Sequence, residues 1–334
     1  MKKGLIIAIV LLVFGNLQSQ DIHFTQFLYS PFNLNPALTG NFEGRYRLGA
    51  NYRQQWRSIT QPFQTTGLWA DSRDFMNLKN TNVGVNFYFD KAGTCDFNTL
   101  HISVPLSYRL NVGQDSTHSF NLGIQPAFNY QSLNIDKLTS DAQWTGTRFD
   151  GSRPINENFQ RTNKGYFDLA LGFTYNLELP KMNFTTGFSV YNLFQPSTQF
   201  LLGDEKTLPR RYNFHVGGKI NIGQEWFATP GILYGRQAKF YELVYGSELN
   251  YIMNNTPYKY RVLFFGLWNR GEDAGILNLG MHYNSWRVGL SYDINYSSLK
   301  TSSNYKGGWE VSIIYILRDL LPKRTNYKYC PDFI

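Results

Sequence analysis

The sequence has little cysteine, little charge and few long apolar runs. Its two Cys among 334 residues cannot build a disulfide scaffold or a cysteine-rich zinc site. Charged and aromatic residues each make up 17% of the chain, which excludes an intrinsically disordered protein. A mean hydropathy of -0.36 excludes a helical protein with many membrane spans. It does not exclude a membrane protein made of β-strands, because such strands hide a lipid-facing surface within an averagely polar composition.

The first 20 residues have the pattern of a secretory signal peptide. Lys2 and Lys3 supply positive charge, residues 4–14 form an apolar core, and Ser19 is a small residue suited to the position before the cut. This core is shorter than the ~18 to 20 residues of a spanning helix. We predict a cleaved signal peptide over residues 1–19, and the alternative is an uncleaved N-terminal anchor.

Beyond residue 20, apolar and polar residues alternate in segment after segment. Trp286, Val288 and Leu290, for example, alternate with Arg287 and Ser291. Side chains on a strand point alternately to opposite faces, so each such segment has an apolar face and a polar face. We predict about 14 strands from this period, at 44–57, 62–74, 81–91, 96–111, 118–132, 164–178, 181–193, 209–223, 225–236, 239–252, 258–269, 273–284, 286–297 and 307–317.

The lengths of the strands and of their connections point to a barrel in a membrane. Several segments exceed about ten residues, which is long for a soluble sandwich. Connections alternate between short turns and a set that includes 133–163, 194–208 and 298–306, as in barrels with periplasmic turns and external loops. We therefore predict an all-β protein, a transmembrane up-and-down antiparallel β-barrel of outer-membrane type over residues 44–317. A soluble sandwich or propeller is the alternative, but no blade-like repeat is visible.

Two segments flank the predicted barrel. Residues 20–43 contain several aromatic residues, interrupted by Pro31, Pro36 and Gly40. We expect this segment to plug or line the lumen or to lie along the periplasmic rim, and the alternative is a simple lead-in to the first strand. Residues 318–334 are expected to form a periplasmic tail. Cys95 would then lie in an external loop and Cys330 in the tail, so the two are not expected to pair.

The N-terminal part of the mature chain resembles the type IX secretion system membrane proteins of the PorP/SprF family. The resemblance is carried by these blocks: Asp21-Ile22-His23-Phe24-Thr25-Gln26-Phe27, Ser30-Pro31, Asn35-Pro36-Ala37-Leu38-Thr39-Gly40, Tyr46-Arg47-Leu48-Gly49-Ala50-Asn51-Tyr52-Arg53-Gln54-Gln55-Trp56 and Pro62-Phe63. It implies a barrel in the cell outer membrane that works with the type IX machinery. It also implies a role in the secretion or surface attachment of an exported protein, such as a gliding adhesin.

The segment Asn35–Gly40 is the candidate for a plug or a partner-binding turn. Pro fixes φ, Gly permits a positive φ, and an Asn side chain can bond its own following backbone. The candidate residues are Asn35, Pro36, Ala37 and Gly40. Polar residues that follow on the first strand could contact this segment from inside the wall, or could simply form a polar lumen: Arg45, Arg47, Asn51 and Arg53.

The sequence carries no motif for catalysis or cofactor binding. HExxH, GxSxG, Walker, GxGxxG and CxxC patterns are missing. We therefore expect no enzyme activity, no cofactor and no metal. Inward-facing His101 and His215 could meet across a lumen, but without carboxylate or Cys support they favour a polar lining over a metal pair. Nucleic acid is not an expected partner of an exported barrel.

Basic residues near the predicted strand ends could bind negatively charged partners. They could meet lipopolysaccharide phosphates or acidic protein surfaces, and the alternative is a solvated rim. These residues are Arg148, Arg153, Arg161, Lys164, Arg210 and Arg211.

A second function remains open from the sequence. Asn35-Pro36-Ala37 echoes a motif in the N-terminal hatch of the fatty-acid channel family, whose barrels have a similar number of strands. The alternative function is therefore the transport of hydrophobic small molecules.

Overall fold

The computed structural model describes residues 24–55, 61–93, 95–113, 117–201, 207–256, 259–297 and 305–317. The expected signal peptide, the expected tail and Cys330 lie outside these residues. The strands are β1 (Tyr46–Gln55), β2 (Phe63–Ser72), β3 (Thr81–Ala92), β4 (Phe97–Ser103), β5 (Leu106–Val112), β6 (His118–Ser132), β7 (Asn163–Glu178), β8 (Met182–Tyr191), β9 (Arg211–Ile222), β10 (Trp226–Gln237), β11 (Phe240–Thr256), β12 (Lys259–Arg270), β13 (Ala274–Tyr283), β14 (Trp286–Asn295) and β15 (Lys306–Leu317).

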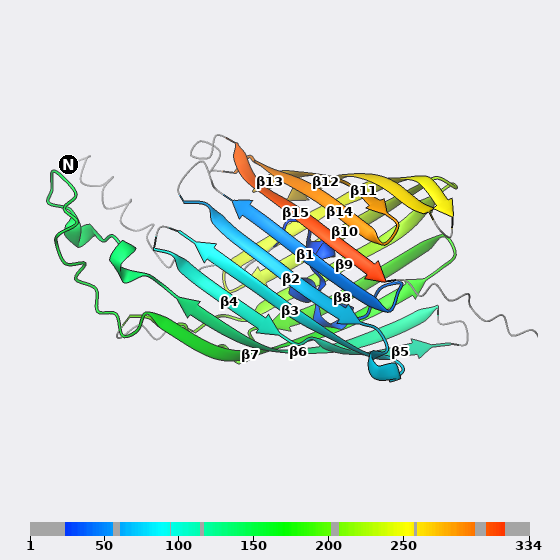
Figure 1. Cartoon of the computed structure of the whole chain (residues 1–334), viewed down its shortest axis with the longest axis horizontal. Coiled ribbons are helices and arrows are strands. Elements are labelled where there is room, and N and C mark those ends of the chain that lie inside the picture. The colour runs from blue at the N-terminus through cyan, green and yellow to red at the C-terminus, as the bar shows by residue number, and fades with distance from the viewer. Residues whose placement is uncertain are drawn as a thin grey trace, which may run out of the picture.

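The strands form a closed antiparallel barrel (Figure 1). β1 pairs with β2 on one side and with β15 on the other, so the sheet has no free edge at its first and last strands. β4 and β5 both lie between β3 and β6 and together make one strand of the wall. The wall therefore has 14 strands, which confirms the predicted fold class.

Proline explains why one predicted strand is divided. The sequence predicts a continuous strand over 96–111, whereas the structure interrupts it between Ser103 and Leu106. Pro105 has no N–H to donate to the ladder. Its carbonyl still accepts from the N–H of Gly84 in β3, at 2.7 Å, so the wall stays closed at the break.

The two ends of the barrel differ in their connections. At one end, the long-loop end, the strands are joined by residues 133–162 and 192–210 among others. The other, the short-turn end, has connections such as 179–181 and 284–285 and also carries both Tyr46 and Leu317, which pair. In Figure 1 the connection between β6 and β7 extends well beyond the barrel. It contains the short helices η4 (Ile135–Lys137) and η5 (Asp141–Gln143).

Burial along the strands is the reverse of that in a soluble protein. In β14, Arg287 and Asp293 are only 4% and 1% exposed, whereas Trp286 and Leu290 are 49% and 44% exposed. The polar face therefore points into the lumen and the apolar face points outward, as a barrel in hydrocarbon requires. No helix among the described residues is long and apolar enough to cross a membrane.

Candidate functional site: a segment that crosses the lumen

Residues 24–42, here called the lumen segment, lie inside the barrel. The segment contains η1 (Phe27–Tyr29), α2 (Pro31–Leu34) and η2 (Pro36–Leu38), which appear as dark blue coils within the wall in Figure 1. Its first described residues bond to β14 and β15 near the long-loop end. It then crosses to β8 and β9, and it reaches the short-turn end where Gly40 bonds to β2.

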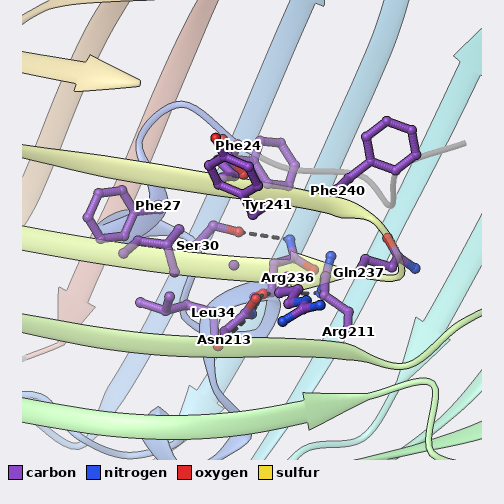
Figure 2. A pocket seen from close by; sticks show the side chains of 14 residues that line it. Phe24, Phe27, Ser30, Leu34, Arg211, Asn213, Arg236, Gln237, Phe240 and Tyr241 are labelled. Atoms are coloured by element: carbon purple, nitrogen blue, oxygen red, sulfur yellow. Dashed lines mark hydrogen bonds between the residues drawn. The ribbon is translucent and has the colours of Figure 1, made fainter. Parts of the chain in front are cut away.

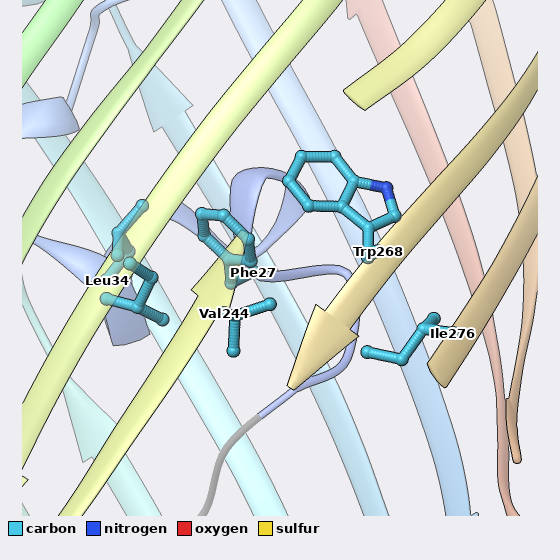
Figure 3. Packing of buried hydrophobic residues seen from close by; sticks show 6 residues of the cluster. Phe27, Leu34, Val244, Trp268 and Ile276 are labelled. Atoms are coloured by element: carbon cyan, nitrogen blue, oxygen red, sulfur yellow. The ribbon is translucent and has the colours of Figure 1, made fainter. Parts of the chain in front are cut away.

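The segment packs against the wall through two apolar clusters. Phe27 and Leu34 lie against Val244, Trp268 and Ile276 (Figure 3). The rings of Phe27 and Trp268 meet edge to face, with centroids 5.4 Å apart.

Near β1 and β2, Phe32 packs in the same geometry on Trp69, at 5.7 Å. Edge-to-face pairs add roughly 0.5–1.5 kcal/mol beyond the burial of their area.

Asn35 fixes the turn Asn35-Pro36-Ala37 on the wall. Its Oδ1 accepts from the N–H of Ala37 at 2.9 Å, and Pro36 supplies the fixed φ at the start of η2. Its Nδ2 donates to the carbonyls of Phe173 in β7 and Phe188 in β8, at 3.0 and 3.2 Å. Asn35 is fully buried, so each of these bonds is made away from water.

Three wall glycines leave the space that this turn occupies. A Cβ at Gly172 would lie 2.0 Å from Asn35 Oδ1, and one at Gly123 would lie 2.3 Å from the nitrogen of Ala37. Gly123 and Gly172 are paired across β6 and β7, so together they form a flat surface under the turn. A Cβ at Gly187 in β8 would lie 2.8 Å from Asn35 Nδ2. Wall and turn are thus complementary in shape.

Gly40 holds the segment at the short-turn end. Its N–H donates to Asp71 Oδ2 at 2.8 Å, and its φ is +69°. A Cβ there would lie 2.3 Å from Asn82 Cγ, so a larger residue is excluded by both conformation and space. The preceding carbonyl, of Thr39, accepts from the Ser107 hydroxyl at 2.7 Å.

Two buried carboxylates hold the other end, and we call Asp293 and Glu310 the carboxylate latch. Glu310 accepts from the N–H of Thr25 at 2.6 Å and from that of Gln26 at 3.3 Å. Asp293 accepts from the Thr25 hydroxyl at 3.1 Å. Asp293 also pairs with Arg270 at 2.8 Å and with Arg53 at 3.2 Å. Asp293 is buried, so the two arginines provide the compensation that its charge needs.

A second charged group holds the middle of the segment. The Tyr29 hydroxyl donates to Glu248 at 2.6 Å, and Arg287 pairs with the same carboxylate at 3.2 Å. The Arg287 guanidinium also stacks over the Tyr29 ring. Wall side chains thus bond the segment along its whole course.

Comparison with protein families identifies the chain. The family model of the type IX secretion system membrane protein PorP/SprF matches residues 16–315. The chain belongs to this family. No curated protein matches it.

The solved structures that resemble this chain have low sequence identity to it. The Ralstonia pickettii toluene transporter TbuX is 10% identical over 84% of this chain and 90% of its own, with a TM-score of 0.49. The CymD monoaromatic hydrocarbon channel is 10% identical over 88% and 94%, with a TM-score of 0.48. A Pseudomonas aeruginosa FadL homologue is 9% identical over 84% and 92%, with a TM-score of 0.48. Likenesses at this level do not indicate a shared ligand.

The residues singled out on the first strand occupy different places. Arg47 pairs with Asp71 at 2.8 Å and donates to the carbonyl of Leu38 at 3.4 Å, so it contacts the lumen segment directly. Arg53 reaches the segment through Asp293. Asn51 accepts from the indole N–H of Trp69 at 3.0 Å.

Arg45 lies elsewhere, at the rim of the short-turn end. It precedes β1 and donates to Asn77 at 2.9 Å.

The two inward-facing histidines lie in separate environments. His101 bonds to Asn129 and Ser103. His215 lies 3.2 Å from the amide of Asn35. Among the described residues, no group of three or more His, Cys, Asp or Glu could hold a metal ion.

Sequence reasoning missed the carboxylates that bind the segment. Asp293 has inward parity on its strand, as the alternation shows, but the sequence singled out only polar residues of the first strand as possible contacts of the segment. The sequence does contain an indication of this contact, because Asp293 is an ionisable residue at an inward-facing position. Such a side chain is costly to bury unless it is paired. Arg211 was expected at a basic rim, and the structure instead places its guanidinium 3.3 Å from the Asn33 carbonyl, inside the barrel mouth.

Proposed function

We propose that this barrel lies in the outer membrane and acts, without catalysis, as a partner of the type IX secretion machinery. In this role it supports the secretion and surface attachment of an exported protein, such as a gliding adhesin. The observation that carries the proposal is the family match over residues 16–315. The apolar outer face supports the membrane assignment, with outer-membrane lipid as its surroundings.

The lumen segment bears on how the exported protein would be handled. The segment contacts the wall on opposite sides of the lumen and fits the glycines of β6, β7 and β8 without spare space. A polypeptide passing through would have to displace it. We therefore infer that the exported protein engages the barrel at an end. The long-loop end, with its connections 133–162 and 192–210, offers the larger surface for a protein partner.

Deletion of the gene tests this function. We expect one or more exported proteins to disappear from the cell surface and to return when the gene is supplied on a plasmid. Biotinylation of intact cells followed by mass spectrometry measures this. Co-purification of the detergent-extracted barrel would in addition recover components of the secretion machinery. Normal surface levels of every type IX client in the deletion strain would contradict the proposal.

The lumen does not favour the transport of hydrophobic small molecules. Its wall carries buried ion pairs such as that of Arg53 with Asp293, and an apolar passenger gains nothing from these. Growth on hydrophobic substrates should accordingly be unchanged by the deletion.

A further inference from the structure

The barrel has hollows on both sides of its wall. One lies inside the long-loop mouth, between the lumen segment and β9, β10 and β11, where the charged Arg211 and Arg236 are part of its lining (Figure 2). The other lies on the outer face, over β1, β2, β3 and β15, which are neighbours in the wall (Figure 1). This second hollow, here called the outer groove, faces the membrane.

The outer groove is short along the strands. β1, β2, β3 and β15 border it over residues 46–50, 68–72, 83–87 and 313–317. Four residue steps along a strand span about 13 Å. The hydrocarbon core of a bilayer is about 30 Å thick, so the groove is no deeper than one leaflet of about 15 Å. A partner that spans the membrane would need a longer contact, whereas the acyl chain of one lipid does not.

The groove lies at the short-turn end. Tyr46 opens β1, and its pairing partners Ser72 and Leu317 close β2 and β15. The rings of Trp286 and Tyr315 both border the groove, with centroids 4.7 Å apart. Trp and Tyr gather at the level of the lipid headgroups. The groove therefore reaches the membrane surface on the short-turn side.

The surface of the groove is apolar. On β1 and β2, the small Ala50 and Ala70 pair with the larger Leu68 and Leu48, so the two alanines leave depth between their neighbours. The larger part of the groove holds about 630 Å³. Sites for small organic molecules are mostly apolar and hold about 300–1,000 Å³, so the groove has room for a hydrocarbon chain.

Two charged residues that border the groove turn away from it. The side chains of Arg47 and Asp71 point into the lumen, where they pair at 2.8 Å. Their charges therefore do not oppose an apolar occupant on the outer face.

A third cation lies at the end of the groove. The Arg45 guanidinium lies over the ring of Tyr46, 5.7 Å from its centroid, and donates to Asn77 at 2.9 Å. Tyr46 borders the groove, and so does Phe75, in the same connection as Asn77. A guanidinium has five N–H donors in a planar fork that matches the oxygens of a phosphate. Arg45 thus lies where the phosphate of a lipid would be when the acyl chain occupies the groove.

We propose that the outer groove binds one glycerophospholipid, with an acyl chain in the groove and the phosphate on Arg45. The lipid belongs to the leaflet at the short-turn end. This inference rests on the proposed function, under which the barrel lies in the outer membrane and its short turns face the periplasm.

Native mass spectrometry of the purified barrel tests the groove. The barrel is titrated in mild detergent with palmitoyl-oleoyl phosphatidylethanolamine, and the fraction that carries one lipid is measured. Ala70→Phe fills the groove, and Arg45→Ala removes the cation at its end. Heat-modifiable migration on gels verifies that each variant is folded.

Each variant has a control at the same end of the barrel. Ala228→Phe adds the same ring on β10, where Ala228 shares the outward parity of the exposed Trp226 and Ile232. Lys181→Ala removes an exposed cation from the turn 179–181. Neither Ala228 nor Lys181 borders the groove.

We expect the two groove variants to weaken binding of the phospholipid. Arg45→Ala should weaken it about tenfold or more, as loss of a charge-assisted hydrogen bond does. Ala70→Phe should weaken it by a similar factor because its ring occupies the space of the chain. Both controls should bind as the wild type does. Palmitoyl-oleoyl glycerol lacks the phosphate, so its binding should be weakened by Ala70→Phe and unchanged by Arg45→Ala.

Equal affinities for the phospholipid in all folded barrels would overturn the proposal. So would a protein that co-purifies with the wild type and is lost with Ala70→Phe while the affinity for lipid is unchanged, because the groove would then belong to that protein. Lipid binding is measured on the isolated barrel and surface proteins on the deletion strain. Failure of the lipid site is therefore distinguishable from failure of the proposed function.

Discussion

The first residues and the turn of the lumen segment are held by different physical means. At the turn Asn35-Pro36-Ala37 the wall accepts through the neutral carbonyls of Phe173 and Phe188, and the fit depends on side chains that the wall lacks, at Gly123, Gly172 and Gly187. At Thr25 and Gln26 the wall accepts through the buried carboxylates of the latch. The turn depends on shape and the latch on charge. The comparison predicts that the turn and the latch respond to different substitutions.

Removing a charge from the latch should have the largest effect. Asp293→Asn keeps the size of the side chain but leaves Arg53 and Arg270 without their shared carboxylate. Breaking a buried ion pair on one side costs about 3–5 kcal/mol. The free energy of unfolding, measured by urea titration in detergent, should fall by this amount.

A substitution beside the latch is the control for this effect. Asp273 lies 3.8 Å from Arg270, and its side chain is 48% exposed. Asp273→Asn should change the free energy of unfolding by no more than about 1 kcal/mol, as for other exposed pairs. Equal losses from Asp293→Asn and Asp273→Asn would show that the latch is not the charged anchor.

Filling the wall under the turn should have the next effect. Gly172→Leu places a side chain where Asn35 Oδ1 now lies, and overpacking of this kind costs typically about 1–3 kcal/mol. The turn should also leave the wall, which limited proteolysis of the purified barrel would detect as new cleavage within residues 24–42. Gly275→Leu should give neither change, because a Cβ at Gly275 meets no atom within 4 Å. An unaltered cleavage pattern for Gly172→Leu would contradict the fit described here.

Loss of the Asn35 amide tests the neutral bonds themselves. Asn35→Leu removes the donor to the carbonyls of Phe173 and Phe188 and the acceptor for the N–H of Ala37. Each buried group left without a partner costs about 1–3 kcal/mol. Thermal unfolding followed by gel migration should show a lower midpoint than in the wild type. Asn33→Leu, which removes one bond within the segment to Ser30, should lower it less.

Arg47 and Arg45, at the start of the first strand, should differ, and Arg45 should give the smallest effect of all. Arg47→Ala removes a pair with Asp71 and a bond to Leu38, and should lower stability by roughly 1–3 kcal/mol. Arg45→Ala affects only rim contacts and should stay within about 0.5 kcal/mol. The same titration compares them, and an equal loss for both would remove the distinction between lumen and rim.

Alternation made the barrel predictable from the sequence. Each wall strand keeps its period for ten residues or more, and each was predicted within a few residues of its observed bounds. The break at Pro105 was not foreseen, because a proline lowers the expectation of a strand without fixing how the ladder closes around it.

The lumen segment was predictable only in part. Asn35, Pro36 and Gly40 stood out because their local conformational roles can be read from a few neighbouring residues. The partners of Thr25 could not be read in this way. Glu310 and Asp293 lie more than 260 residues further along the chain. Such pairing depends on the closure of the whole barrel, which no local pattern encodes.

The course of the lumen segment can be tested by cross-linking in a background with Cys95→Ala and Cys330→Ala. The Gln26 side chain accepts from the buried Ser312 hydroxyl at 2.7 Å, whereas the buried Ser107 bonds the opposite end of the segment at Thr39. With a short thiol cross-linker, Gln26→Cys should link to Ser312→Cys and should not link to Ser107→Cys. A link to Ser107→Cys, or none to Ser312→Cys in a folded barrel, would contradict a segment that crosses the lumen from the long-loop end to the short-turn end.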